Sequence, residues 1–250
     1  MPLTIPVGVS NRHFHLAQAD VEILFGSAYQ LTKLRDISQK GQFAANEMLI
    51  AIGPKGKIEK IRIVGPTRGK TQLEISRSDA VLLGIDPPVR YSSDLANSAG
   101  VFLLGPKGEL HLKEGVIIAQ RHIHMSPADA KNFGVKDRDR VVVAPVAKMA
   151  VPNSEARTVI FDNVLIRVHE NFVLDFHIDL DEANAAGLKT GDQVRILGLS
   201  AQHETAPTVK LITENDVRRA ILEKRRIKVP AGAKITPAAA ELAKTHKVFI

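Results

Sequence analysis

The sequence predicts a mainly β fold, with two β-barrels related by an internal duplication, short capping helices and a small α-helical C-terminal tail. Short strand-like runs recur between turns rich in Gly and Pro, and no long helix is present that could cross over between parallel strands. An Arg-His-apolar-His-apolar stretch also occurs twice, at residues 12–16 and 121–125, and Ala-Asp follows each copy after two residues. The repeat indicates two similar halves.

Each half is expected to consist of short strands and brief helices. In the first half, Ser78 is a candidate N-cap for a short helix over 78–83. In the second half, Asp162-Asn163 predicts a hairpin turn between two strands. We expect further helices at 17–25, 126–133 and 181–186, and strands at 2–9, 31–34, 48–52, 58–64, 72–75, 101–104, 109–113, 115–119, 140–145, 158–161, 164–168, 174–178 and 192–197.

Residues 199–208 are polar and indicate a linker to a separate tail, residues 209–250. The tail is expected to hold two helices, the first capped by Thr213 with an apolar stripe of Val217, Ile221 and Leu222. A helix of about 12 residues is marginal alone in water, so this stripe needs a surface to pack on. From Lys210 onward, ten basic residues face four acidic ones, a net charge of +6 out of +7 for the chain. The tail therefore predicts a docking element, and a C-terminal cap on a barrel is the alternative.

Composition excludes several classes of protein. The chain of 250 residues contains no cysteine, which removes disulfides, thiolate metal sites and a cysteine nucleophile. No apolar run approaches the roughly 18 residues of a membrane span, and there is no signal-peptide pattern, so we expect no membrane association and a cytoplasmic location. Basic loops with interleaved aromatics are absent, so we expect no nucleic-acid partner.

The repeated histidines indicate metal sites. Strand periodicity places His13 and His15 on one face, and likewise the two histidines of the second copy, His122 and His124. A second pair of similar stretches, 74–80 and 177–183, begins with Glu74 and His177 at an offset of 103, close to the 109 of the first repeat. Each half thus offers three ligands. Such trios suit zinc with an open position, although cobalt, nickel or manganese would also fit, and the alternative is ordinary surface histidines.

A Gly-bounded basic loop at 65–71 holds Arg68, and Arg62 lies on the strand before it. A planar guanidinium binds two oxygens of a phosphate at once, so an Arg beside metal sites favours phosphate chemistry. An exposed turn arginine is the alternative. The loop is no Walker A motif, and no Gly-x-Gly-x-x-Gly follows a strand, so a nucleotide site is not indicated.

Four segments together resemble the phosphate propanoyltransferase family, phosphotransacylases associated with bacterial microcompartments: 10–15 (SNRHFH), 65–76 with Arg68 and QLEIS, 121–126 (RHIHMS) and 177–184 (HIDLDEAN). The resemblance covers roughly residues 2–198. It implies that the barrels interleave, with residues 2–11 and 120–198 forming barrel 1 and residues 12–119 forming barrel 2. It also implies transfer of an acyl group between coenzyme A and phosphate at a dinuclear zinc site.

By this resemblance each position acquires a role. One zinc would be held by His13, His15 and Glu74, and the other by His122, His124 and His177; Arg68 would bind phosphate; Ser10, Arg62 and Asn184 would contact coenzyme A, with Arg35 as a further candidate. The chain begins directly at the first strand, without the N-terminal targeting helix that microcompartment members often carry.

Other functions remain open from the residues alone. A metal-dependent thioesterase or phosphatase would use the same ligands to activate water. A non-catalytic microcompartment protein would use them only for stability. We further expect a homodimer or higher homo-oligomer, and a microcompartment partner for the tail.

Overall fold

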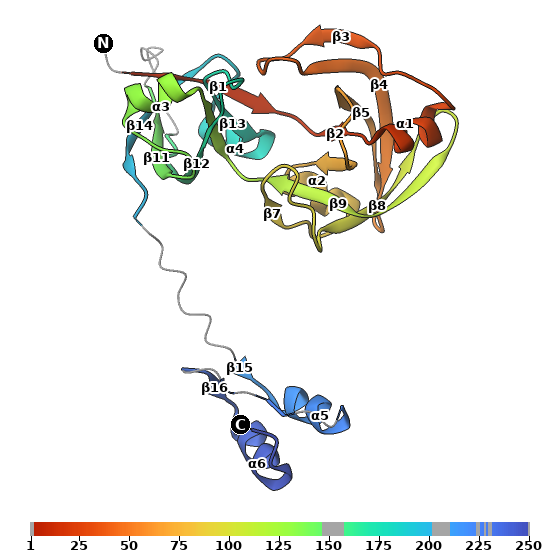
Figure 1. Cartoon of the computed structure of the whole chain (residues 1–250), viewed down its shortest axis with the longest axis vertical. Helices are drawn as coiled ribbons and strands as arrows, with labels where there is room; N and C mark the ends of the chain where they lie inside the picture. Colours follow the sequence, from red (N-terminus) through yellow and green to blue (C-terminus); the bar gives the residue numbers. More distant parts are fainter. Residues whose placement is uncertain are drawn as a thin grey trace. The chain divides into compact units, whose positions relative to one another are not determined.

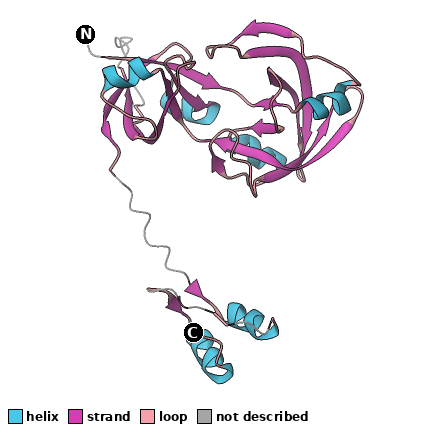
Figure 2. Ribbon diagram, in the orientation of Figure 1, coloured by secondary structure: helices cyan, strands magenta, loops and turns pink. Residues whose placement is uncertain are grey.

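A computed structural model describes residues 3–146, 158–201, 211–223, 226–227, 229 and 232–249. The chain divides into two compact units, Met1–Ser200 and Ala201–Ile250. The first unit is mainly β, with its short helices outside the sheets (Figures 1 and 2). No helix among the described residues is long and apolar enough to cross a membrane.

Barrel 1 is closed and combines the N-terminal strand with the second half of the chain. Its strand order is β1-β13-β10-β12-β11-β14. The strands are β1 (Ile5–Ser10), β10 (His122–Met125), β11 (Arg140–Pro145), β12 (Phe161–Val168), β13 (Asp175–Asp179) and β14 (Gln193–Leu199). Strand β1 pairs in parallel with β13 and antiparallel with β14, so the barrel closes only with residues from the start of the chain (Figure 1).

Barrel 2 is formed by the residues in between. Its strands are β2 (His13–His15), β4 (Phe43–Ile52), β5 (Lys57–Gly65), β6 (Gln72–Glu74), β8 (Ala99–Leu104) and β9 (Glu109–Ala119). The ring closes because β8 pairs with both β4 and β9. Two shorter strands, β3 (Lys33–Asp36) and β7 (Val89–Arg90), attach to β4 and β9. Each barrel has its own apolar core, centred on residues such as Phe14 in barrel 2 and Phe176 in barrel 1.

The same local pattern occurs in both barrels. Strand β2 lies between a parallel neighbour, β5, and an antiparallel neighbour, β6. Strand β10 likewise lies between the parallel β12 and the antiparallel β13. The prediction of a mainly β fold with two interleaved, duplicated barrels is therefore confirmed.

Four short helices cover the barrels: α1 (Gln18–Phe25), α2 (Arg77–Leu83), α3 (Pro127–Phe133) and α4 (Leu180–Ala186). The last three begin with a capping box, at Ser76, Ser126 and Asp179. The predicted N-cap Ser78 is wrong, because Ser76 is the residue whose hydroxyl accepts from the backbone N–H of Asp79. A glycine in the left-handed conformation ends each of these three helices. A residue with a Cβ adopts this conformation less readily.

The predicted hairpin at Asp162-Asn163 is also wrong. These residues lie inside the continuous strand β12, where Asn163 has a φ of 58°. The register between β11 and β12 shifts at this end of the strand, which marks a β-bulge. An Asp-Asn pair tolerates the left-handed conformation in either setting, so the residues alone do not separate a turn from a bulge.

The second unit contains β15 (Leu211–Ile212), α5 (Glu214–Leu222), β16 (Lys234–Ile235) and α6 (Pro237–His246), and β15 pairs in parallel with β16. It has a small apolar core of its own. Val217 is fully buried there, and Ile221 packs at its edge. Leu222 is 83% exposed, so its assignment to the buried stripe is wrong. The helix has nine residues, and the two helices supply each other with a packing surface.

Candidate active site

A pocket of about 750 Å³ in the first unit is lined by side chains from both barrels. This volume lies within the range of small-molecule sites. The lining includes Ser10, His13, His15, Arg35, Arg62, Arg68, Glu74, His122, His124 and His177. The pocket therefore gathers all six predicted metal ligands and most of the predicted substrate contacts.

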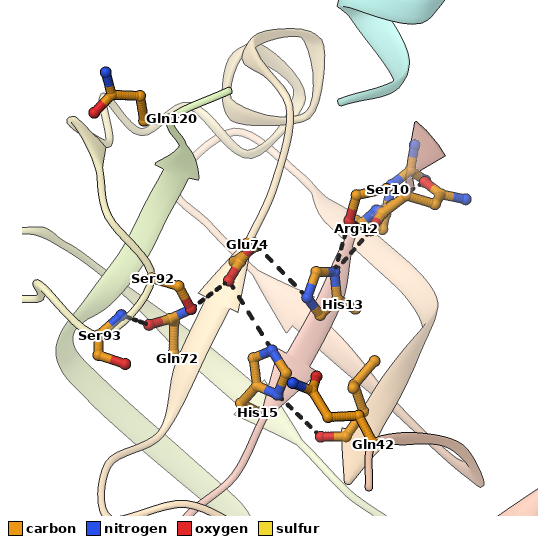
Figure 3. Close-up of polar contacts among 12 residues, drawn as sticks. Ser10, Arg12, His13, His15, Gln42, Gln72, Glu74, Ser92, Ser93 and Gln120 are labelled. Atoms are coloured by element: carbon orange, nitrogen blue, oxygen red, sulfur yellow. Dashed lines mark hydrogen bonds and ion pairs between the residues drawn. The ribbon is translucent and has the colours of Figure 1, made fainter. Parts of the chain in front are cut away.

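The first trio is compact. Strand pairing places His13 directly opposite Glu74, and His15 follows on the same face of β2. Nε2 of His13 lies 3.7 Å from Oε2 of Glu74, and Nε2 of His15 lies 4.0 Å from Oε1 (Figure 3). One ligand atom of each residue falls within 4.8 Å of the others. The three side chains are thus arranged so that one metal ion could contact all of them.

Backbone carbonyls orient both imidazoles. Nδ1 of His13 donates to the carbonyl oxygen of Asn11 at 2.9 Å, and Nδ1 of His15 donates to that of Val64 at 3.0 Å. Nε2 of each ring then faces Glu74, which is the orientation found in metal-binding histidines. Burial lowers the pKa of His15 to about 2, and the neighbouring His13 and Arg68 act in the same direction. His15 is therefore neutral and able to coordinate at physiological pH.

The second trio converges in barrel 1. His122 pairs with His177 across β10 and β13, and the three rings of His122, His124 and His177 have centroids 4.6 to 5.0 Å apart. Nδ1 of His122 donates to the carbonyl oxygen of Gln120 at 2.8 Å, two residues back, as His13 does to Asn11. Burial, followed by the effect of His177, lowers the pKa of His122 to about 3.

Three nitrogens of this trio are buried without a hydrogen-bond partner among the described residues: both ring nitrogens of His124 and Nε2 of His177. Buried polar atoms are normally paired, so their state fits a ligand between the rings. Within the described part of the chain, however, only the first trio meets the 4.8 Å grouping. Nε2 of His177 lies instead 3.3 Å from Oδ2 of the buried Asp175.

A polar network holds Glu74, and sequence reasoning missed it. Oε1 of Glu74 accepts from Nε2 of Gln72 at 2.5 Å and from the Ser92 hydroxyl at 3.0 Å, while the Ser93 N–H donates to Oε1 of Gln72 at 2.6 Å (Figure 3). These contacts fix one carboxylate oxygen and leave Oε2 turned toward His13. Gln72 could have been found, because strand periodicity puts it on the face of Glu74. Ser92 carries no such signal, because it comes from a separate loop.

Arg68 reaches the same network. Its backbone N–H donates to the carbonyl oxygen of Leu16 at 2.8 Å, which ties the loop to the end of β2. Its guanidinium donates to the Ser92 hydroxyl at 3.2 Å and to Oε1 of Gln42 at 3.5 Å, both neutral acceptors. Burial lowers the pKa of Arg68, and the nearby Glu74 carboxylate opposes this effect. A half-buried cation whose hydrogen-bond acceptors among the described residues are neutral is suited to an anionic ligand.

The profile of the phosphate propanoyltransferase family matches residues 6–189, the greater part of the chain. The chain belongs to this family. Three similar proteins, each called phosphate propanoyltransferase, come from Thermotoga maritima, Priestia megaterium and Lachnoclostridium phytofermentans. They are 54, 50 and 49% identical over 193, 189 and 194 residues, covering 77, 76 and 77% of this chain and 89, 83 and 87% of the respective relatives. The predicted membership of this transferase family is confirmed, and the second unit lies beyond the matched residues.

Of the predicted coenzyme A contacts in this phosphate propanoyltransferase family member, Ser10 and Arg62 line the pocket. The Ser10 hydroxyl lies 3.4 Å from Nδ1 of His13, and Arg62 donates to the carbonyl oxygen of Ala45 at 2.6 Å. Asn184 is exposed on α4 and is not among the lining residues, so its role stays a prediction. Sequence reasoning also missed Arg167 on β12, which lines the pocket within an otherwise apolar run.

Proposed function

We propose that the protein moves a short acyl group between coenzyme A and inorganic phosphate, so that acyl-CoA and phosphate are converted into acyl phosphate and coenzyme A. The observation that carries the proposal is the shared pocket. It holds a three-residue donor set of the kind that binds catalytic metals, together with Arg68, whose guanidinium donates to two neutral acceptors among the described residues. The names of the relatives agree with this reaction.

We further propose two zinc ions, one at His13, His15 and Glu74 and one at His122, His124 and His177. The donor sets fit, because burial lowers the pKa of His15 and of His122, so these two rings are neutral, and both ring nitrogens of His124 are buried without a hydrogen-bond partner among the described residues. Zinc bound there would act as a Lewis acid that stabilises a thiolate and polarises phosphate oxygens.

The chain's own residues would bind and orient the reactants. Arg68 would hold phosphate so that one oxygen faces the thioester carbonyl, which lowers the entropic barrier to attack. The new C–O bond forms as the C–S bond breaks, and coenzyme A leaves as thiolate. Gln72 and Ser92 would keep Glu74 in place, and Ser10, Arg62 and Asn184 would contact coenzyme A. No acyl-enzyme is needed, and the chain has no cysteine that could form one.

A thiol-release assay tests the reaction against its alternatives. Acetyl-, propanoyl- and butanoyl-coenzyme A are each incubated with metal-loaded protein, with and without phosphate. The transferase should release thiol only with phosphate and form acyl phosphate in equal amount. Thiol release without phosphate would identify a thioesterase. No release from any substrate would favour a non-catalytic protein. The same data rank the three acyl chains.

We also propose that the protein is cytoplasmic, forms a homodimer or higher homo-oligomer and is housed in a bacterial microcompartment through its C-terminal unit. This unit has a separate core, a high positive charge and exposed leucines at positions 211 and 222. Sedimentation would measure the oligomeric state. Purified microcompartments should contain the full-length protein but lack a form that ends after Ala201.

A further inference from the structure

Arg167 is a half-buried cation that has no hydrogen-bond or ion-pair partner among the described residues. It lies on β12 directly beside His124 in parallel register and lines the pocket. Its guanidinium packs over the ring of Phe172, 5.4 Å from the ring centroid. Within the described parts of the chain, it makes no hydrogen bond and no ion pair. A guanidinium has five donors, and leaving them unpaired in a half-buried place is costly, so this side chain is suited to an acceptor from a bound ligand.

The positive charges of Arg167 and Arg68 both face the pocket, and they affect each other. Arg167 lowers the pKa of Arg68 by charge repulsion, and Glu74 raises the pKa of both arginines. Both arginines line the pocket, one from each barrel. Glu74 acts on both of them, and Asp137 and Tyr91 also raise the pKa of Arg167. If Glu74 binds a metal ion, its negative charge offsets the charges of the two arginines less. An anion between the two guanidiniums would relieve their repulsion and satisfy their donors.

The duplication shows that Arg167 is not required by the barrel itself. In barrel 1 the residue paired with the second histidine of the motif is Arg167. In barrel 2, continuing the register of His13 with Arg62 and Phe14 with Ile63 places Val64 beside His15. A β-branched apolar residue thus serves this position in one barrel. The arginine in the other barrel is a departure that points to the pocket.

We propose that Arg167 is a second phosphate-binding residue, which together with Arg68 clamps the phosphate that accepts or donates the acyl group. This inference rests on the proposed function. Phosphate is favoured because its oxygens project in several directions, so guanidiniums from two barrels can each bind it through different oxygens. The acyl phosphate carries the same group, so one clamp serves both directions of the reaction.

The test uses the full chain, loaded with metal, and the variants Arg167→Gln, Arg68→Gln and the double substitution. Arg195→Gln is the matched control, because Arg195 is exposed on β14 and does not line the pocket. The KM values for phosphate and for acyl-CoA are measured separately, and inorganic phosphate is titrated calorimetrically into each variant. Metal content and melting temperature are recorded for all of them.

Arg167→Gln should raise the phosphate KM and Kd roughly tenfold to a hundredfold, as expected for one charged contact to an anion, and leave the acyl-CoA KM unchanged. Because both arginines would bind one anion, the double substitution should cost less than the product of the two single effects. If Arg167→Gln lowers metal content or stability, Arg167→Lys decides: it keeps the charge but loses the planar fork, and it should still weaken phosphate severalfold.

Unchanged phosphate binding in Arg167→Gln, or in Arg167→Lys where that variant is used instead, would overturn the inference. A raised acyl-CoA KM with normal phosphate binding would overturn it too, because it would assign Arg167 to the phosphates of coenzyme A. Either result leaves the proposed function standing. That function fails by a different result, thiol release by the unmodified protein that does not depend on phosphate.

Discussion

Gln39 links the two barrels beside the pocket, and its replacement should loosen the second trio. Its side chain is 4% exposed. Nε2 donates to the carbonyl oxygen of Val173 at 3.1 Å, and Oε1 accepts from the Val173 N–H at 3.2 Å. The residue before Val173, Phe172, packs against the His124 ring with centroids 4.1 Å apart. Gln39 in barrel 2 thus holds the loop that covers a predicted metal ligand in barrel 1.

Gln39→Ala removes both hydrogen bonds. Each contributes about 1 kcal/mol net, and the half-buried backbone groups of Val173 can be reached by water only in part, so the loss should be roughly 2–3 kcal/mol. For a unit of this size, that corresponds to a fall in melting temperature of roughly 4–12 °C. Turnover should fall as well, because Phe172 no longer holds His124 in one orientation.

Gln39→Glu gives a sharper test, because protonation restores the lost donor. An ionised carboxylate places a second acceptor against the carbonyl of Val173, whereas the protonated acid can donate to it. The folded-state pKa of the new carboxyl group is therefore raised above its unfolded value of about 4.3. The stability of Gln39→Glu should approach that of the unmodified protein as the pH falls toward the unfolded pKa of about 4.3. This stability should be lost as the pH rises through the folded-state pKa.

The assay is urea unfolding of metal-free protein between pH 4.5 and 7.5, with Gln193→Ala as the control at an exposed glutamine. Differences from the unmodified protein at each pH cancel the titration of all other groups. A deficit of Gln39→Glu that is the same at every pH would refute the reasoning. So would a loss below about 0.5 kcal/mol for Gln39→Ala, the value typical of surface substitutions.

Four further outcomes are expected. Elemental analysis should find close to two zinc ions per chain and close to one in His122→Ala, and a value near zero in active protein would contradict the site. Arg68→Ala should raise the phosphate KM roughly tenfold to a hundredfold, while Lys70→Ala, exposed in the same loop, should not. Burial lowers the pKa of His15 to about 2 and of His122 to about 3, so the folded state excludes protons that the unfolded chain binds. The unfolding free energy of metal-free protein should then be constant above pH 6.5 and fall below it by about 1.4 kcal/mol per pH unit for each histidine, with a shallower slope in His15→Gln. A chain ending after Ala201 should keep its turnover and melting temperature, because the units have separate cores; insoluble or inactive protein would show that the second unit completes the first.

The sequence predicts features that depend on local patterns. Alternation and turn residues identified most strands, and the repeat identified the two halves. The closure of barrel 1 by β1 was accessible only through resemblance to a family, because no local pattern shows that residues 5–10 pair with a strand about 170 residues later. The prediction for the tail was wrong at Leu222 for a related reason. Helical spacing grouped Leu222 with Val217, but the position of α6 decides which of them is covered.

The residues of the site also separate into those that a sequence pattern predicts and those that only the tertiary structure brings together. The six predicted ligands could be proposed from the sequence because each belongs to a repeated motif, and the structure places all six at the pocket. Gln39, Ser92 and Arg167 lie outside the repeated motifs. Gln39 and Ser92 bond to residues 134 and 18 positions away in the chain, and Arg167 lies beside His124 on a neighbouring strand. Each lies where the halves differ: a loop between barrels, a segment beside Glu74, and a strand position that is Val64 in the other half. In a duplicated fold, the residues common to both copies form the scaffold and the predicted ligands. The residues that differ between the copies make the pocket asymmetric. Two identical halves would offer two equivalent sites, whereas the proposed reaction of acyl-CoA with phosphate needs one pocket with two different ends. The Arg167 and Val64 pair is the clearest such difference that the structure places at the pocket.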